Sequence, residues 1–167
     1  MLSTRFIREL TLASPQNADS ARHISAASGM VVAGRFLYVI ADDELHLGVF
    51  DTSGAEAGTL VRLFPGVLPN APAERKALKP DLEALVRIPS FPGYPHGALL
   101  ALASGSKPNR RTGAVLKLDE SGLIVGEPRR YDLTPFYSPL ESRFPALNIE
   151  GAVALGDELV LFQRGAR

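Results

Sequence analysis

Short apolar runs alternate with turn-forming residues along most of the chain. Near the start, residues 29–33 and 36–41 are apolar runs joined by Gly34 and Arg35, a two-residue connection typical of β-hairpins. Two further runs follow, and glycine or proline lies just beyond each of them. This pattern predicts four short strands. Their expected bounds are residues 29–33, 36–41, 45–50 and 59–64.

The same order of apolar runs begins again after a linker rich in proline and alanine. This linker, residues 67–80, is expected to be a loop with one helical turn over residues 73–78. A later linker, residues 134–147, is expected to be helical over residues 138–143. A strand is also expected over residues 6–12, ahead of the first unit. The remaining expected strands are residues 82–88, 98–103, 114–118 and part of 128–133, and a third unit begins at Ile149.

Two sequence motifs recur in the same order, which indicates an internal repeat. Residues 29–42 align with residues 151–164 without a gap, so that Leu37 falls on Leu159. The turn Asp-Thr-Ser-Gly at residues 51–54 recurs as Asp-Glu-Ser-Gly at residues 119–122. Four-stranded units with turns at fixed positions are typical of propeller blades, which bury their faces against neighbouring blades. The chain is therefore predicted to be all-β, an incomplete β-propeller of four-stranded blades; a β-sandwich is the alternative.

The predicted blades divide a single domain, residues 1–167, into about two and a half units. Because propellers close with four to eight blades, a complete ring needs further strands. We expect the sequence to be the N-terminal part of a longer protein, whose C-terminal blades close the ring. A truncated product, or a second chain that completes the ring, are the alternatives. Blade 1 is expected at about residues 24–66, blade 2 at about 80–133 and a partial blade 3 at about 148–167.

Composition narrows the range of partners. The 167 residues carry a formal net charge of zero, so the chain lacks the strong basic field that attracts nucleic acid. No cysteine is present, which excludes disulfides and cysteine-ligated zinc. Charges interrupt the N-terminus where a signal peptide has its apolar core, and no apolar run reaches the ~18 residues of a membrane span. We therefore expect a cytoplasmic protein with no membrane partner, unless the true start lies upstream and supplies an export signal.

Two glutamates occupy corresponding positions of the repeat. Glu83 and Glu150 each lie at the start of a strand that is expected to line the propeller axis, and Ser28 takes this position in the first blade. Carboxylates gathered near an axis would suit a hard cation such as calcium. The alternative is a structural role, in which each carboxylate accepts hydrogen bonds from the backbone of the neighbouring blade.

A second group of candidate residues is mostly basic. Arg164 ends a strand, and Arg110 and Arg111 lie in the loop between the second and third strands of blade 2. With Asp42, these residues are expected on the same face of the propeller as Glu83. Arginine binds phosphate or carboxylate through two parallel N–H groups. They therefore predict a site for a small anionic molecule, although a solvated loop is the alternative for Arg110 and Arg111.

The openings of the three blades also resemble those of a known group. These openings are residues 28–30 (SGM), 81–85 (DLEAL) and 149–152 (IEGA). They are similar to the SGL, EGL and EGI motifs of the SdiA-regulated and phytase-esterase-like β-propellers, although Ala84 stands where glycine is usual. The resemblance covers most of the chain, as a partial propeller. It implies a metal-assisted phosphoesterase, with Glu83 and Glu150 near the metal or the phosphate.

Two functions of different classes follow from these residues. The first is a metal-assisted hydrolase acting on a phosphate ester, in which Glu83 and Glu150 help to hold a calcium ion and Arg164 holds the anionic group. The second is a non-catalytic propeller that binds a small ligand or a protein on its upper face.

Overall fold

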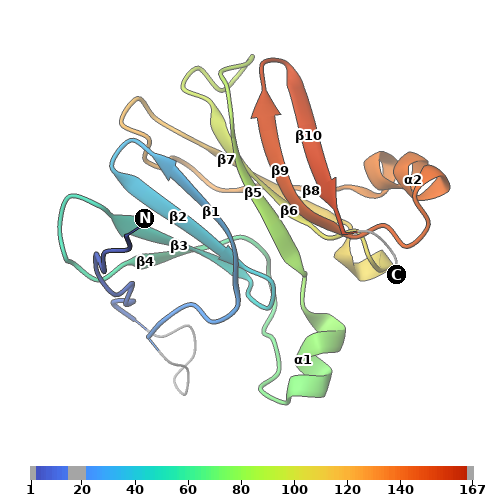
Figure 1. Ribbon diagram of the computed structural model, residues 1–167, viewed down its shortest axis with the longest axis horizontal. Helices are drawn as coiled ribbons and strands as arrows, with labels where there is room; N and C mark the ends of the chain where they lie inside the picture. The colour runs from blue at the N-terminus through green and yellow to red at the C-terminus, as the bar shows by residue number, and fades with distance from the viewer. Residues whose placement is uncertain (1–2, 15–21, 165–167) are drawn as a thin grey trace.

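Three antiparallel sheets follow one another along the chain (Figure 1). The structure is a computed structural model, and it describes residues 3–14 and 22–164. In the first sheet each strand pairs with the next in chain order, as the alternation of apolar runs predicts. Its strands are β1 (Ala27–Ala33), β2 (Phe36–Ala41), β3 (His46–Asp51) and β4 (Thr59–Arg62).

The second sheet repeats this order, and the third has two strands in the described part of the chain. Both predicted helical segments are present, as α1 (Pro72–Leu78) and α2 (Thr134–Arg143). The prediction of an all-β protein built from antiparallel four-stranded sheets is confirmed. The remaining strands are β5 (Leu82–Ile88), β6 (Ala98–Ala103), β7 (Thr112–Lys117), β8 (Arg129–Asp132), β9 (Ile149–Leu155) and β10 (Glu158–Gln163).

The first strands of the three sheets are neighbours in space. β5 contacts β1 on one side and β9 on the other, so the three sheets fan out from this central group (Figure 1). The hairpins β1–β2 and β9–β10 also share their turn geometry, because Gly34 and Gly156 both have a positive φ of 57° and 59°. Glycine adopts this left-handed conformation without the steric penalty of a Cβ, so both turns need only two residues.

The main core lies between the first and second sheets. Tyr38 and Ile40 of β2 are fully buried in one apolar cluster with Leu99 of β6 and Leu116 of β7. Each such side chain contributes about 1.5–3 kcal/mol through burial. The Tyr38 hydroxyl donates a hydrogen bond of 2.6 Å to the carbonyl oxygen of Gly122, so its polar end is satisfied inside the core. The packing of these two faces fixes how the first two sheets meet.

The predicted strand over residues 6–12 is wrong. Leu12 forms an isolated parallel bridge to Gly58, outside the three sheets, and residues 3–11 form no strand. Phe6 and Ile7 are 78% and 80% exposed, so their apolar side chains have no sheet face to cover. The guanidinium of Arg8 instead holds the segment, because it donates to the carbonyl oxygens of the turn after β3.

Two other expectations concern the end of the third blade and membrane-spanning segments. Residues 165–167, the end of the predicted third blade, lie outside the described residues. Across the described ranges, none of the helices has both the length and the apolar character required to cross a bilayer.

Candidate functional site

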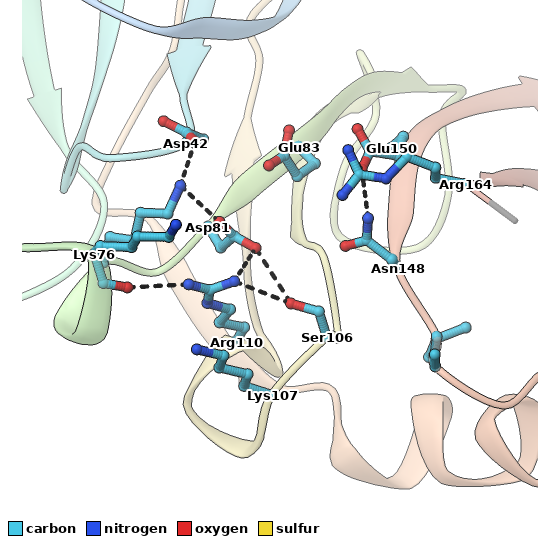
Figure 2. Close-up of a pocket in the computed structure, with 13 residues that line it drawn as sticks. Asp42, Lys76, Asp81, Glu83, Ser106, Lys107, Arg110, Asn148, Glu150 and Arg164 are labelled. Atoms are coloured by element: carbon cyan, nitrogen blue, oxygen red, sulfur yellow. Dashed lines mark hydrogen bonds and ion pairs between the residues drawn. The ribbon is translucent and has the colours of Figure 1, made fainter. Parts of the chain in front are cut away.

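A polar cavity of about 890 Å³ lies where β5 and β9 begin (Figure 2). The sequence predicted that side chains from several loops and strand ends would share one face, and the cavity brings most of these together. Five of the six residues predicted to contact a ligand or a metal line its wall, and Arg111 does not. The predicted residues that line it are Asp42, Glu83, Arg110, Glu150 and Arg164.

In the first strand of each sheet, a β-bulge leaves one residue without a partner on the neighbouring strand, and these three residues occupy equivalent positions of the repeat. In β5, Leu82 pairs with Ala103 and Ala84 with Leu102, so Glu83 has no partner of its own. The ladder shifts in the same way around Ser28 of β1 and Glu150 of β9. A bulge leaves one extra residue unpaired and turns its side chain away from the regular alternation. This geometry explains why polar residues interrupt otherwise apolar strands at three matching positions.

The three bulge residues have different partners. The Ser28 hydroxyl donates a hydrogen bond of 2.5 Å to the Leu82 carbonyl oxygen, which links the first sheet to the second. Glu150 accepts a hydrogen bond of 2.5 Å from the Asn148 side chain and lies 3.3 Å from the Arg164 guanidinium. Among the described residues, the Glu83 carboxyl makes no hydrogen bond or ion pair. Glu83 is therefore the bulge residue whose polar group is available within the cavity.

Three carboxylates converge on one side of the cavity. Oxygens of Asp42, Asp81 and Glu83 all lie within 4.8 Å of one another, a spacing at which they could surround a cation. The Lys79 ammonium is already in this group, 2.8 Å from Asp81 and in contact with Asp42. Burial lowers the pKa of Lys79, but its hydrogen bonds to the two aspartates outweigh that effect and leave the pKa raised. Lys79 therefore stays charged and neutralises much of the cluster.

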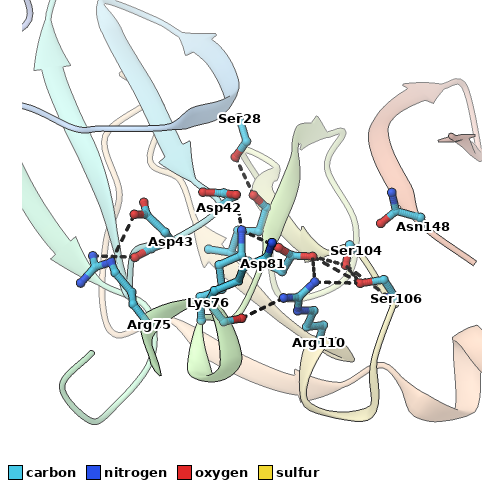
Figure 3. Close-up of polar contacts among 12 residues, drawn as sticks. Ser28, Asp42, Asp43, Arg75, Lys76, Asp81, Ser104, Ser106, Arg110 and Asn148 are labelled. Atoms are coloured by element: carbon cyan, nitrogen blue, oxygen red, sulfur yellow. Dashed lines mark hydrogen bonds and ion pairs between the residues drawn. The ribbon is translucent and has the colours of Figure 1, made fainter. Parts of the chain in front are cut away.

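Asp81 is the centre of a buried polar network (Figure 3). It is 5% exposed and accepts hydrogen bonds of 2.5 Å from the Ser104 hydroxyl and 2.9 Å from the Arg110 guanidinium. Burial raises the pKa of Asp81, but the hydrogen bonds from Lys79 and Ser104, with the charge of Arg110, outweigh it and leave the pKa lowered. Asp81 is therefore ionised and fully engaged by the protein itself.

Glu83 has the opposite electrostatic environment. Burial raises the pKa of its carboxyl to about 7, from an ordinary value of 4.5. The negative charges of Asp81, Glu150 and Asp42 act in the same direction, and Lys79 opposes them only in part. Near neutral pH the Glu83 carboxyl therefore exists in both protonation states, so it can donate or accept a hydrogen bond.

The two candidate arginines of the β6–β7 loop lie in different places. Arg110 is 7% exposed and is held by Asp81 and by the Lys76 carbonyl oxygen, so its guanidinium belongs to the cavity wall. Arg111 lies outside the cavity, where it forms two hydrogen bonds of 2.8 Å with Glu141 of α2. The structure therefore separates neighbouring residues that the sequence grouped together.

Two lysines of the cavity were missed by the sequence analysis. Lys76 lies in α1 and Lys79 follows it, in a segment that was expected only to be a loop with one helical turn. The helix is anchored by Arg75, whose guanidinium contacts Asp43 at 3.2 Å and Glu44 at 2.8 Å. The spacing of three residues between the lysines, which puts both on one side of a helix, is the signal that could have found them.

Comparison with known proteins places the chain in a family and does not assign a function. No curated protein matches the sequence significantly. No solved structure matches it significantly either. The profile of one family, described as a family of unknown function (DUF6929), matches residues 23–167, nearly the whole chain. The chain therefore belongs to the family of unknown function DUF6929.

Proposed function

We propose that the three sheets are blades of a β-propeller and that the cavity lies on its axial face. The strand order supports this proposal, because each four-stranded sheet is a simple meander whose first strand lies beside the first strand of the next sheet (Figure 1). The matching bulges support it as well, because they direct Ser28, Glu83 and Glu150 from equivalent points of neighbouring sheets.

We further propose that this cavity binds a small anionic molecule without chemical conversion. One observation carries the proposal: Lys76, Lys107 and Arg164 reach the cavity from three separate segments and are not needed to hold the wall together. Within the described residues, the Lys76 and Lys107 ammonium groups make no hydrogen bond or ion pair. Arg164 is 73% exposed, so its contact with Glu150 is solvated and weak.

The charge balance of the wall favours an anion. Five cationic and four acidic residues line the cavity, and Lys79 and Arg110 already neutralise Asp81. The raised pKa of Glu83 removes part of one further negative charge at neutral pH. A protonated Glu83 would donate a hydrogen bond to an oxygen of the ligand, and the free cations would supply charge-assisted hydrogen bonds. Phosphate and carboxylate groups have the oxygens that such a site requires.

Calorimetric titration with inorganic phosphate tests this function. We expect Lys107→Ala and Arg164→Ala each to weaken binding by about tenfold, roughly 1.4 kcal/mol, because each removes a charge-assisted contact. Lys117→Ala is the matched control, since it removes the same charge from the exposed end of β7, outside the cavity. Equal phosphate affinities for the unaltered chain and its three variants would contradict the proposal. So would the absence of phosphate binding by the unaltered chain at millimolar concentration.

A metal-assisted hydrolase acting on a phosphate ester is the second candidate. It is favoured by the convergence of Asp42, Asp81 and Glu83 oxygens within 4.8 Å, since calcium takes carboxylate ligands. A divalent ion would have to displace the Lys79 ammonium, so the residues fit an ion only after this rearrangement. Glu150 would add negative charge beside Glu83, and Arg164 would hold the phosphate.

A calcium titration followed by melting temperature separates the two candidates. An ion that binds only the folded state must raise the melting temperature, and Lys79→Met should increase that shift by removing the competing ammonium. If calcium, magnesium and manganese all leave both melting temperatures unchanged, the hydrolase candidate fails. The anion-binding proposal would survive that result.

A further inference from the structure

The four acidic residues that line the polar cavity differ in whether the protein supplies them with hydrogen-bond donors. Asp42 and Asp81 both contact the Lys79 ammonium. Glu150 accepts a hydrogen bond from a nearby asparagine side chain. Glu83, which is only partly buried, accepts no hydrogen bond from any residue of the described ranges. The cavity therefore has one carboxylate whose oxygens receive no donor from the part of the chain that the structure describes.

The charged groups around Glu83 do not supply such a donor. Oxygens of Asp42 and Asp81 lie within 4.8 Å of a Glu83 oxygen. The negative charge of Glu150 acts on Glu83 as well, and the positive charge of Lys79 opposes it only in part. The hydrogen bonds of Lys79 go to the two aspartates. A ligand that displaces water from the cavity must therefore bring the donor for Glu83 itself, or leave this acceptor unsatisfied.

Cations of the same cavity are available to hold a ligand beside Glu83. Arg164 lies 3.3 Å from Glu150, whose charge also acts on Glu83. Figure 2 shows these three side chains along one side of the cavity. Lys76 and Lys107 line the cavity as well, and their ammonium groups make no hydrogen bond or ion pair within the described residues. An oxyanion that is held by these cations therefore meets a carboxylate.

The hydrogen-bonding groups of an oxyanion decide whether it suits this arrangement. An ionised carboxylate only accepts hydrogen bonds. Hydrogen phosphate is a tetrahedral dianion with one O–H group, whereas sulfate has a similar shape, the same charge and no O–H group at neutral pH. Both anions experience a similar repulsion from the Glu83 charge, so the O–H group is the main difference between them. Hydrogen phosphate can donate a hydrogen bond to Glu83, and sulfate cannot.

We propose that Glu83 makes the polar cavity selective for oxyanions that carry an O–H group, such as hydrogen phosphate, over oxyanions that carry none, such as sulfate. This inference rests on the anion-binding function proposed above. The O–H group of the ligand donates to Glu83, and its other oxygens accept charge-assisted hydrogen bonds from Arg164 and the two lysines. A fully ionised phosphate monoester also lacks an O–H group on phosphorus, so the same rule disfavours it. The preferred ligand is therefore free phosphate.

Calorimetric titration of the full chain at pH 8 with inorganic phosphate, sulfate and methyl phosphate tests the proposal. At this pH all three anions are chiefly dianions, and the Glu83 carboxyl, with a pKa of about 7, is mostly ionised. Phosphate should bind about tenfold more tightly than either of the other anions, because each of those leaves the Glu83 acceptor unsatisfied. Equal affinities for the three anions would overturn this inference and leave the anion-binding function standing. No binding of any of them at millimolar concentration would overturn both.

Two variants provide a matched pair. Glu83→Gln should reduce the preference for phosphate over sulfate to less than about threefold, because an amide can donate a hydrogen bond to either anion. Glu150→Gln removes the same charge at the corresponding bulge of β9. It should raise the affinities for phosphate and sulfate together and leave the preference at about tenfold, because Glu150 already has a donor within the protein. Far-UV circular dichroism establishes that both variants fold. A tenfold preference that persists in Glu83→Gln, or that disappears in Glu150→Gln, would overturn the proposal.

Discussion

The two walls of the polar cavity hold their carboxylates in different ways. On one wall, Asp81 is buried and bound by Lys79, Ser104 and Arg110, so its charge is paired within the protein. On the other wall, Glu150 meets an arginine that is 73% exposed, and solvent competes for both groups. The comparison separates two roles: the buried wall holds the structure together, and the exposed wall can exchange its partner for a ligand.

The largest predicted change in stability comes from removing the Asp81 carboxylate from the buried wall. Asp81→Ala leaves Lys79 and Arg110 charged and without their common counter-ion, which should lower the free energy of unfolding by about 3–5 kcal/mol. Urea denaturation at pH 7 measures this change. Asp81→Asn, which keeps an oxygen for the Ser104 hydroxyl, should lose less. A loss below about 1 kcal/mol in Asp81→Ala would show that the network contributes little.

Glu83, between the two walls, should make stability depend on pH. Its pKa in the folded state is about 7, whereas its ordinary value is 4.5. Between these values the folded state retains a proton that the unfolded state has released, so the contribution of Glu83 to stability falls as pH rises through this window. At pH 8, Glu83→Gln should be more stable than the unaltered protein by about 1–3 kcal/mol, a range reduced for partial exposure.

Unfolding curves at pH 4.5 and pH 8 measure that difference. The advantage of Glu83→Gln should shrink to less than about 0.5 kcal/mol at the lower pH, where Glu83 is protonated in the folded state and about half protonated in the unfolded state. If the stability difference between Glu83→Gln and the unaltered protein is the same at pH 4.5 and pH 8, the Glu83 carboxyl is not the group that makes stability depend on pH. Glu158→Gln serves as the control, because it makes the same substitution at an exposed residue of β10 that does not line the cavity.

A smaller effect is expected at the bulge of the first sheet. Ser28→Ala removes the hydrogen bond of 2.5 Å to the Leu82 carbonyl oxygen and should lower the free energy of unfolding by about 1 kcal/mol. Thermal and urea unfolding measure it. Ser25→Ala, at an exposed residue ahead of β1, is the control and should change stability by less than about 0.5 kcal/mol. If Ser28→Ala and Ser25→Ala change the free energy of unfolding equally, the contact between the first two sheets does not depend on Ser28.

The smallest effect on stability should come from the exposed wall. Glu150→Gln should change the free energy of unfolding by less than about 0.5 kcal/mol, because its partner Arg164 is solvated. The same substitution releases Arg164 and removes a nearby negative charge, so phosphate affinity should rise severalfold. Calorimetry on the variant measures this gain. Reduced affinity would mean that Glu150 orients Arg164 for the ligand and does not compete with it.

Much of the fold follows from short-range patterns in the sequence. Turn residues such as Gly34 and the apolar runs beside them depend on local backbone preferences, so the strands of all three sheets and both helical segments were placed within a few residues. The segment of residues 6–12 has a similar apolar pattern, but it forms only a single bridge, from Leu12 to Gly58 beside β4. The hydrophobic periodicity of a segment indicates whether it would form an amphipathic strand. It does not indicate whether the segment will pair with another strand.

The candidate site was predictable only in part, for a related reason. Glu83 and Glu150 were found because the repeat aligned them, and Asp42 and Arg164 because they end equivalent strands. The role of Lys79 was not predictable, since it depends on how a linker helix folds back over the strand ends. Arg110 and Arg111 were treated alike, but a difference of one residue in a loop points one side chain to Asp81 and the other to Glu141.

The three bulges have a consequence for how this protein can change over time. A bulge residue pairs with no residue of the neighbouring strand, so replacing its side chain leaves strand pairing and register intact. Serine in one sheet and glutamate in the other two occupy this position without altering the neighbouring pairs. The chemistry of the cavity can therefore diversify residue by residue, while the scaffold that presents it stays constant.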